Sequence, residues 1–124
     1  MQSKSLILAK LHLEKIVDVI TDRPLASQHP KHGFVYEANY GYIPDTQAPN
    51  GEELDVYVLG ISESVESFRG KCIAIIHRLN DDDDKLVIVP ESLSDMSDED
   101  ICTATNFQEQ FFQSEIIRYL IGVY

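Results

Sequence analysis

The first group of side chains able to do chemistry is basic and lies early in the sequence. Arg23, His29, Lys31 and His32 fall within ten residues of one another. In a chain of formal net charge −11, such a cluster is costly unless an anion compensates it. Arginine offers phosphate a bidentate fork and lysine a point charge, so the segment predicts a phosphate cradle. The alternative is that these groups pair with the protein's own excess carboxylates.

The second group consists of three tyrosines, Tyr36, Tyr40 and Tyr42, spaced by four and two residues. Side chains alternate along a strand, so this spacing places all three on one face. Phenolic hydroxyls on a rigid strand can donate to phosphate oxygens. The alternative is that the rings are ordinary core aromatics of a barrel wall.

The third group is acidic. Glu52, Glu53 and Asp55 follow the Asn50-Gly51 turn, and four consecutive aspartates occupy 81–84. Hard dications such as Mg²⁺ take oxygen ligands from a few carboxylates, and water and substrate phosphate complete the shell. The run 81–84 is not an EF-hand, because no glycine stands at the sixth loop position. Its alternative role is a solvated hairpin tip.

Composition narrows the function classes further. The chain has 124 residues, 44% of them hydrophobic, and a pI near 4.6. An acidic surface repels phosphate backbones and anionic lipid, so we expect neither nucleic-acid nor membrane binding. Cys72 and Cys102 lie 30 residues apart without a CxxC motif, which indicates reduced core thiols. With no signal segment and no apolar run of about 20 residues, we expect a cytoplasmic protein.

Familiar catalytic motifs are absent. The sequence has no P-loop, no GxGxxG, no zinc pattern and no context for a serine or cysteine nucleophile. The enzyme classes that remain depend on metal-assisted chemistry.

The elements that must position these groups are mostly strands. Partial alternation and β-branched or aromatic content predict strands at 16–21, 35–43, 54–59, 71–77 and 85–89. The last two should form a hairpin around the acidic tip, and 22–34 should be a loop or irregular hairpin. Ser94 and Ser97 are candidate N-caps of a helix whose apolar positions extend from Ile101 to Leu120. Strands followed by a helix favour a single α+β domain over 1–124: a small closed or curled antiparallel β-barrel, OB-like, with a C-terminal helix.

Two motifs resemble soluble inorganic pyrophosphatases of the single-barrel type. The first joins Tyr-Glu-Ala-Asn-Tyr-Gly-Tyr-Ile-Pro (36–44) to Asn-Gly-Glu-Glu-Leu-Asp-Val (50–56), and the second is the acidic segment 81–90, which ends Lys-Leu-Val-Ile-Val-Pro. A shorter variant of the family, with an Asp-Arg-Pro-Leu-x-Ser-x-His-Pro-Lys-His-Gly loop, is similar to residues 22–33. The resemblance covers roughly 16–118 and is tight over 36–59 and 77–90.

This resemblance implies Mg²⁺-dependent hydrolysis of pyrophosphate to two phosphates by a metal-activated water, in a homo-oligomer. It implies catalytic roles for Asp55 (bridging ligand or base), Tyr40 and Lys85. The implied metal ligands are Glu52, Asp55, Asp81 and Asp83. Tyr36 is the implied phosphate contact. We add four basic residues on physical grounds as expected phosphate contacts: Arg23, Lys31, His32 and Arg78.

Departures from the family's pattern fall at important positions. The first metal aspartate is replaced by Asn50 and the second by Glu52, so we expect a weakened metal site. The family's tyrosine-lysine pair near the last helix falls on Phe111 and Phe112, which cannot bind phosphate through a polar group. A hydrolase of another small phosphorylated substrate, and a non-catalytic phosphate-binding barrel, are therefore alternatives. Whether His29 and His32 are metal ligands or anion contacts stays open at this point.

Overall fold

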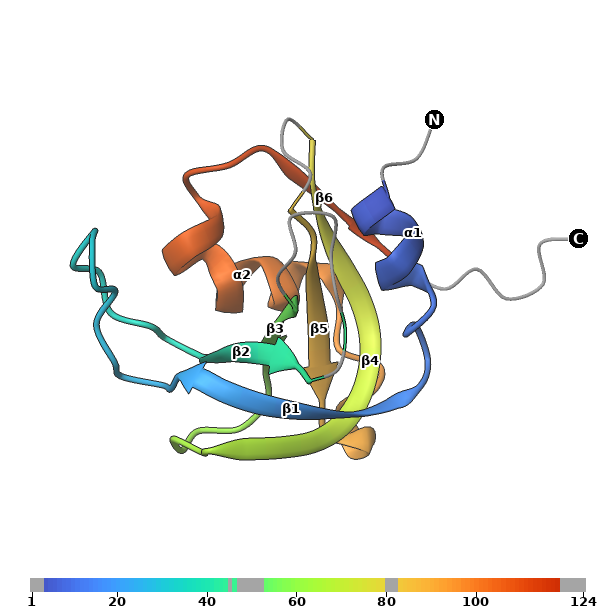
Figure 1. Ribbon diagram of the computed structural model, residues 1–124, viewed down its shortest axis with the longest axis horizontal. Coiled ribbons are helices and arrows are strands. Elements are labelled where there is room, and N and C mark those ends of the chain that lie inside the picture. The colour runs from blue at the N-terminus through green and yellow to red at the C-terminus, as the bar shows by residue number, and fades with distance from the viewer. Residues whose placement is uncertain (1–3, 45, 47–52, 80–82, 119–124) are drawn as a thin grey trace, which may run out of the picture.

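The computed structural model describes residues 4–44, 46, 53–79 and 83–118. Figure 1 shows a strongly curved sheet with one helix at each side. The elements in chain order are α1 (Lys4–Lys10), β1 (Ile16–Arg23), β2 (Asn39–Ile43), β3 (Leu54–Val58), β4 (Ser67–Arg78), β5 (Lys85–Val89), the 3₁₀ turn η1 (Glu91–Leu93), α2 (Asp98–Glu109) and β6 (Ser114–Ile117). None of the described helices is long and apolar enough to span a bilayer.

The sheet closes into a five-stranded barrel. Its strand order is β1-β2-β3-β5-β4, and β1 also pairs with β4 to complete the circle. The predicted barrel is confirmed, but the prediction that it is wholly antiparallel is wrong, because β3 and β5 run parallel. In sequence, β4 lies between β3 and β5. It pairs antiparallel with β5, as predicted, and β5 in turn pairs with β3 on its other edge. The parallel pairing places Asp55 directly opposite Lys85.

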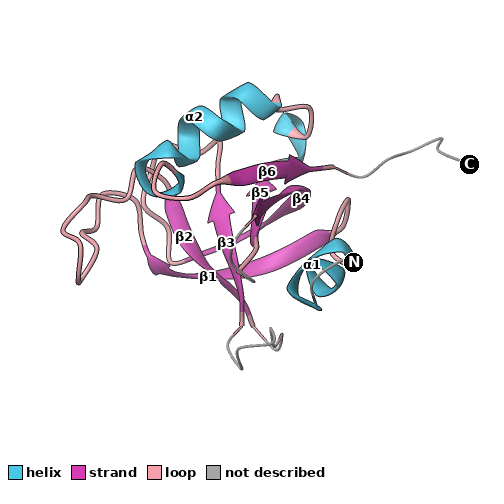
Figure 2. Ribbon diagram, turned by 90° about the horizontal axis from the view of Figure 1, so that it is seen from above, coloured by secondary structure: helices cyan, strands magenta, loops and turns pink. Residues whose placement is uncertain are grey.

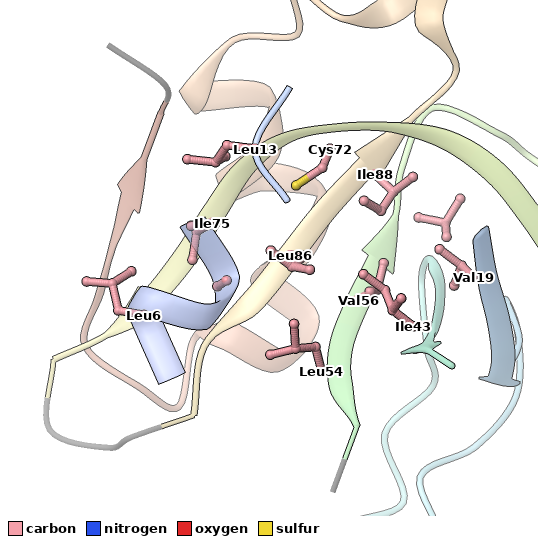
Figure 3. Close-up of a cluster of buried hydrophobic side chains, with 12 residues drawn as sticks. Leu6, Leu13, Val19, Ile43, Leu54, Val56, Cys72, Ile75, Leu86 and Ile88 are labelled. Carbon is pink, nitrogen blue, oxygen red and sulfur yellow. The ribbon is translucent and has the colours of Figure 1, made fainter. Parts of the chain in front are cut away.

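Two apolar clusters cover the two faces of the sheet. One lies on the α1 side and is formed by alternate strand residues together with Leu6 and Ala9 (Figure 3). The other lies under α2 and includes Ile101 and Phe107 of that helix. Figure 2 shows α1 and α2 on different sides of the sheet. Strand β5 contributes to both clusters, so all five of its residues are buried and its sequence is apolar after Lys85.

The C-terminal helix is shorter than predicted and is followed by a strand. Ser97 caps α2 by accepting a hydrogen bond from the backbone N–H of Asp100, as predicted. Ser94 is not an N-cap of this helix, because it is the C-cap of the 3₁₀ turn η1. The helix stops at Glu109, and 114–117, predicted as helix, form strand β6 against β4.

The predictions for the segment before β2 and for the two cysteines are only partly confirmed. The predicted loop 22–34 is a loop from residue 24 onward, but Asp22 and Arg23 belong to β1. Strand β2 begins only at Asn39, and Val35 makes an isolated bridge to Gln28. Both cysteines are free; Cys72 is buried as expected, but Cys102 is exposed on α2, so the prediction of a second core thiol is wrong.

Candidate active site

One cavity of about 740 Å³ lies where the β1–β2 loop approaches the end of α2. Figures 1 and 2 both place that loop beside the helix end. The lining residues come from every barrel strand, from the loop and from α2: Asp22, Arg23, His29, His32, Phe34, Tyr36, Tyr40, Asp55, Arg78, Lys85, Gln108, Phe111 and Phe112. The cavity thus collects seven of the residues that the sequence singled out for catalysis or substrate binding.

A bulge at the end of β1 directs two neighbouring side chains into the cavity. The register with β2 shifts between Thr21 and Arg23, so Asp22 and Arg23 both line the cavity although they are adjacent in sequence. The close approach of β1 requires glycine on the facing strand. A Cβ at Gly41 would lie 1.9 Å from the carbonyl oxygen of Ile20.

Lys85 lies between two carboxylates. Its Nζ donates to Asp55 Oδ2 at 2.6 Å and to Asp83 Oδ1 at 2.9 Å. Asp55 and Lys85 are direct partners in the parallel register of β3 and β5, so the backbone pairing itself holds them together. The Lys85 ammonium also lies 5.6 Å from the centre of the Tyr40 ring.

Arg78 is held by a buried acid. Its Nε and Nη2 donate to Glu109 Oε1 and Oε2 at 3.1 and 2.8 Å, and its Nη1 donates to Asp83 at 3.3 Å. Burial alone would lower the pKa of Arg78, but the bonds and charge of Glu109 and the charge of Asp83 more than offset it and raise the pKa. The Phe112 ring covers the guanidinium at 3.6 Å. Arg78 is therefore a fixed cation at the cavity wall.

Two tyrosines line the cavity and stay neutral. Burial, together with the charges of Asp55 and Asp83, raises the pKa of Tyr40 well above its usual range. Burial also raises the pKa of Tyr36, although the Arg23 guanidinium opposes the shift. Both hydroxyls therefore keep their proton at neutral pH and can donate to a bound anion. Tyr42, from the same sequence cluster, does not line the cavity.

In the basic loop between β1 and β2, some side chains stabilise the turn and others line the cavity. His29 Nδ1 accepts hydrogen bonds from the backbone N–H groups of Lys31 and His32, both at 3.1 Å. Desolvation and the neighbouring positive charges of His32, Arg23 and Lys31 lower the pKa of His29. At neutral pH its proton is therefore on Nε2. His32 lines the cavity, whereas Lys31 is exposed and lies outside the lining.

Comparison with known proteins decides the family. A sequence model of the family described as inorganic pyrophosphatase matches residues 9–120. The chain belongs to the inorganic pyrophosphatase family. No curated protein sequence matches it.

Solved pyrophosphatase structures share the fold. The inorganic pyrophosphatase from Ehrlichia chaffeensis is 20% identical with a TM-score of 0.64, over 86% of this chain and 87% of that chain. The enzyme from Coxiella burnetii is 21% identical with a TM-score of 0.60, over 87% of each chain. The enzyme from Helicobacter pylori is 14% identical with a TM-score of 0.61, over 86% of this chain and 85% of that chain. These similarities confirm the predicted α+β barrel, and the family is one of hydrolases.

Inorganic pyrophosphatases are generally metal-dependent, and the charges of this cavity suit a cation. Three cations line the cavity, Arg23, Arg78 and Lys85. Four carboxylates accompany them: Asp22 and Asp55 in the lining, and Asp83 and Glu109 as ion-pair partners of Arg78 and Lys85. Within the described part of the chain, Arg23 is the cavity cation without a carboxylate partner. A cavity whose own charges nearly cancel cannot hold a polyanion strongly, and a dication would supply the missing positive charge.

The donor chemistry also fits a hard dication. Partial burial raises the pKa of Asp22; Arg23 opposes the shift, and the negative charges of Asp55 and Glu53 add to it. The carboxylates thus repel one another where a cation would relieve them. Among the described residues, no three acidic, histidine or cysteine side chains form a ready ligand group. The predicted ligands Glu52 and Asp81, like Asn50, lie outside the described residues.

Five residues of the cavity lining, and Glu109, which holds the lining residue Arg78, were missed by sequence reasoning or were set aside there. Asp22, Phe34, Gln108 and Glu109 carried no predicted role, and Phe111 and Phe112 were noted only as departures from the pyrophosphatase pattern. One signal for Glu109 was available. It lies eight residues after Ile101, on the buried face of α2, where a charged side chain requires a partner.

Proposed function

We propose that this chain hydrolyses inorganic pyrophosphate to two phosphates, with Mg²⁺ as cofactor and water as the nucleophile. Membership of the pyrophosphatase family supports the reaction. The observation that carries the proposal is the convergence of Asp55, Lys85 and Asp83 at one wall of a cavity that Tyr40 and Arg23 also line.

The metal ligands proposed are Glu52, Asp55, Asp81 and Asp83. A Mg²⁺ ion held there would supply an activated water and neutralise negative charge on the leaving phosphate. Asn50 and Glu52 replace the aspartates of the family pattern, so we propose weaker metal affinity than that pattern would give.

Several side chains of this chain have roles that follow from their positions. Arg23 is the proposed main phosphate contact, because no described carboxylate occupies its guanidinium. Tyr36, Arg78 and His32 are further proposed substrate contacts from the cavity wall. Lys31, exposed beside His32, adds positive charge at the edge of the site.

Catalysis is assigned to the group around Lys85. Asp55 is the proposed base or bridging ligand, and its bond to Lys85 holds the carboxylate in place at the cavity wall. Lys85 can exchange one of its two carboxylate partners for a phosphate oxygen and so stabilise developing negative charge. The Tyr40 hydroxyl donates a hydrogen bond to the same anion.

The setting of the reaction is also proposed. We propose a cytoplasmic homo-oligomer, one catalytic domain per chain over 1–124, with no nucleic-acid or membrane partner. These points rest on the acidic composition and on the resemblance to the family.

The test is phosphate release from pyrophosphate, with and without Mg²⁺, by wild type and by Asp55→Asn. We expect metal-dependent release that falls by roughly 10²-fold or more in Asp55→Asn. Asp18→Asn is the matched control, because Asp18 lies in an exposed pair with Arg69 away from the cavity, and it should keep full activity. No release by wild type at any Mg²⁺ concentration would refute hydrolysis; if pyrophosphate still raised the melting temperature, a binding role would replace it.

A further inference from the structure

Beside the charged end of the cavity stands an aromatic wall, which the cleavage of pyrophosphate does not need. The wall consists of His29, His32, Phe34, Phe111 and Phe112. Ring centres are 4.7 Å apart for His29 and His32, 4.8 Å for His29 and Phe34, and 6.1 Å for Phe34 and Phe111. Rings at these separations form a continuous surface.

The inner part of this wall is anchored while its outer part is open. Phe34 packs edge-on against Phe107 of α2 at 6.2 Å, and Phe112 lies on the Arg78 guanidinium. Phe111 nevertheless leaves 65% of its surface exposed and Phe112 leaves 38% exposed. A core role does not explain a phenylalanine that is two-thirds exposed at the edge of a cavity. Exposed aromatic faces are the usual partners of planar ligands.

The wall joins the phosphate end without a break. Phe34 lies 5.4 Å from Tyr36, Tyr36 lies 5.6 Å from Tyr40, and Lys85 lies 5.6 Å from Tyr40. Lys85 at one end of this series is buried, and Phe111 at the other end is exposed. The cavity therefore presents cations and phenols at its inner end and ring faces at its outer end.

Size agrees with this two-part character. Cavities of about 300–1,000 Å³ hold organic ligands of drug size. At about 740 Å³, this cavity has room for much more than a diphosphate. A ligand that uses the whole of it carries a phosphoanhydride at one end and a planar ring at the other.

We propose that the cavity takes nucleoside diphosphates and triphosphates, with the phosphates near Arg23 and Lys85 and the base stacked on Phe111 and His32. The inference rests on the proposed function, because pyrophosphate and the nucleotides would bind their phosphates at the same end of the cavity. Hydrolysis follows the same displacement. The oxygen of water bonds to the terminal phosphorus, the anhydride P–O bond breaks, and the bridging oxygen leaves with the shorter nucleotide. One proton is released to solvent.

Calorimetric titration with a matched pair of non-hydrolysable ligands tests the proposal. The probes are methylenediphosphonate and the α,β-methylene analogue of ADP, which differ only in the nucleoside. In Mg²⁺ buffer we expect wild type to bind the nucleotide analogue more tightly. Phe111→Ala should weaken nucleotide binding about tenfold, or 1.4 kcal/mol, and change diphosphonate binding less than twofold.

Two further variants separate stacking from structural damage. Phe111→Tyr keeps a ring face and should retain nucleotide affinity. Ile7→Ala removes another exposed apolar side chain, 52% exposed on α1 and away from the cavity lining. It should change the affinity for neither the nucleotide analogue nor the diphosphonate.

The other outcomes are distinguishable. Diphosphonate binding without nucleotide binding overturns this inference and leaves pyrophosphate hydrolysis standing. Equal loss of both ligands in Phe111→Ala makes the residue structural and also overturns it. Binding of neither ligand by wild type overturns the proposed function together with the inference.

Discussion

The buried ion pair between Arg78 and Glu109 gives a stability prediction whose size follows from the structure. Glu109 is the last residue of α2, and both of its oxygens accept hydrogen bonds from the Arg78 guanidinium. The side chains are only 5% and 8% exposed. Tyr57 adds a third bond by donating its hydroxyl to Glu109 at 2.7 Å. The pair therefore joins α2 to the barrel wall.

The substitution Glu109→Gln keeps the shape of the side chain and removes its charge. Leaving one member of a buried pair uncompensated costs about 3–5 kcal/mol. Asp83 still contacts Arg78 at 3.3 Å, but it is itself 34% exposed, so its compensation is partial. We expect the lower end of the range, about 3 kcal/mol. For a chain of 124 residues this corresponds to a drop in melting temperature of about 10 °C.

Urea denaturation of wild type, Glu109→Gln and Asp18→Asn measures the effect. Asp18 and Arg69 form a pair of similar distance, 3.0 Å, but they are 65% and 69% exposed. Asp18→Asn should therefore cost less than about 1 kcal/mol. The urea dependence of the unfolding free energy should stay unchanged in both variants, because neither alters the surface exposed on unfolding.

A double variant tests the cause of the loss. If the cost comes from a buried charge without its partner, Arg78→Met combined with Glu109→Leu should be more stable than Glu109→Gln alone. A loss in Glu109→Gln no larger than that in Asp18→Asn would refute the reasoning. So would a double variant less stable than the single one, because lost contacts would then outweigh the uncompensated charge.

Two other predictions concern the sheet and the thiols. Gly41→Ala places its Cβ 1.9 Å from the Ile20 carbonyl oxygen, so thermal unfolding should show a loss of at least about 1–3 kcal/mol. Burial raises the pKa of the Cys72 thiol to about 12, so between pH 7 and 9 a thiol reagent should label only exposed Cys102 in the folded protein, and both cysteines in urea. Rapid labelling of two thiols in the native state would contradict the burial of Cys72.

Strand positions could be read from the sequence because burial repeats locally. β5 is a run of apolar residues after Lys85, and β3 alternates around Val56 and Val58. The partner of each strand is not a local property, which is why the parallel pairing of β3 with β5 was missed. Ile116 and Ile117 were misread as helix because two adjacent apolar residues suit a helix face as well as an edge strand.

Those residues of the candidate site that lie close together in one strand or loop could be predicted from the sequence. Arg23, Tyr36 and Tyr40 lie close in sequence and do meet in the cavity. Glu109 and Asp22 were missed because their partners are distant in sequence or their direction depends on a bulge. Lys31 belongs to the same basic cluster in sequence, but it is exposed and lies outside the cavity lining, so its predicted substrate contact stays a prediction.

The departures from the pyrophosphatase pattern concern the metal ligands in the sequence and the outer wall of the cavity. In the sequence, Asn50 replaces a carboxylate of the family's metal-ligand pattern, so the metal that would neutralise a bound phosphate should bind more weakly. At the outer end of the cavity, Phe111 and Phe112 replace a phenol and an ammonium, so a hydrogen-bond donor and a positive charge are lost there. A pyrophosphate ion depends on charge alone, and it loses affinity from both changes. A nucleoside diphosphate recovers part of that loss by stacking on the rings that replaced the charge. The two substitutions at the outer end thus shift the relative affinity from the inorganic to the organic phosphoanhydride, even if both ligands share Arg23 and Lys85.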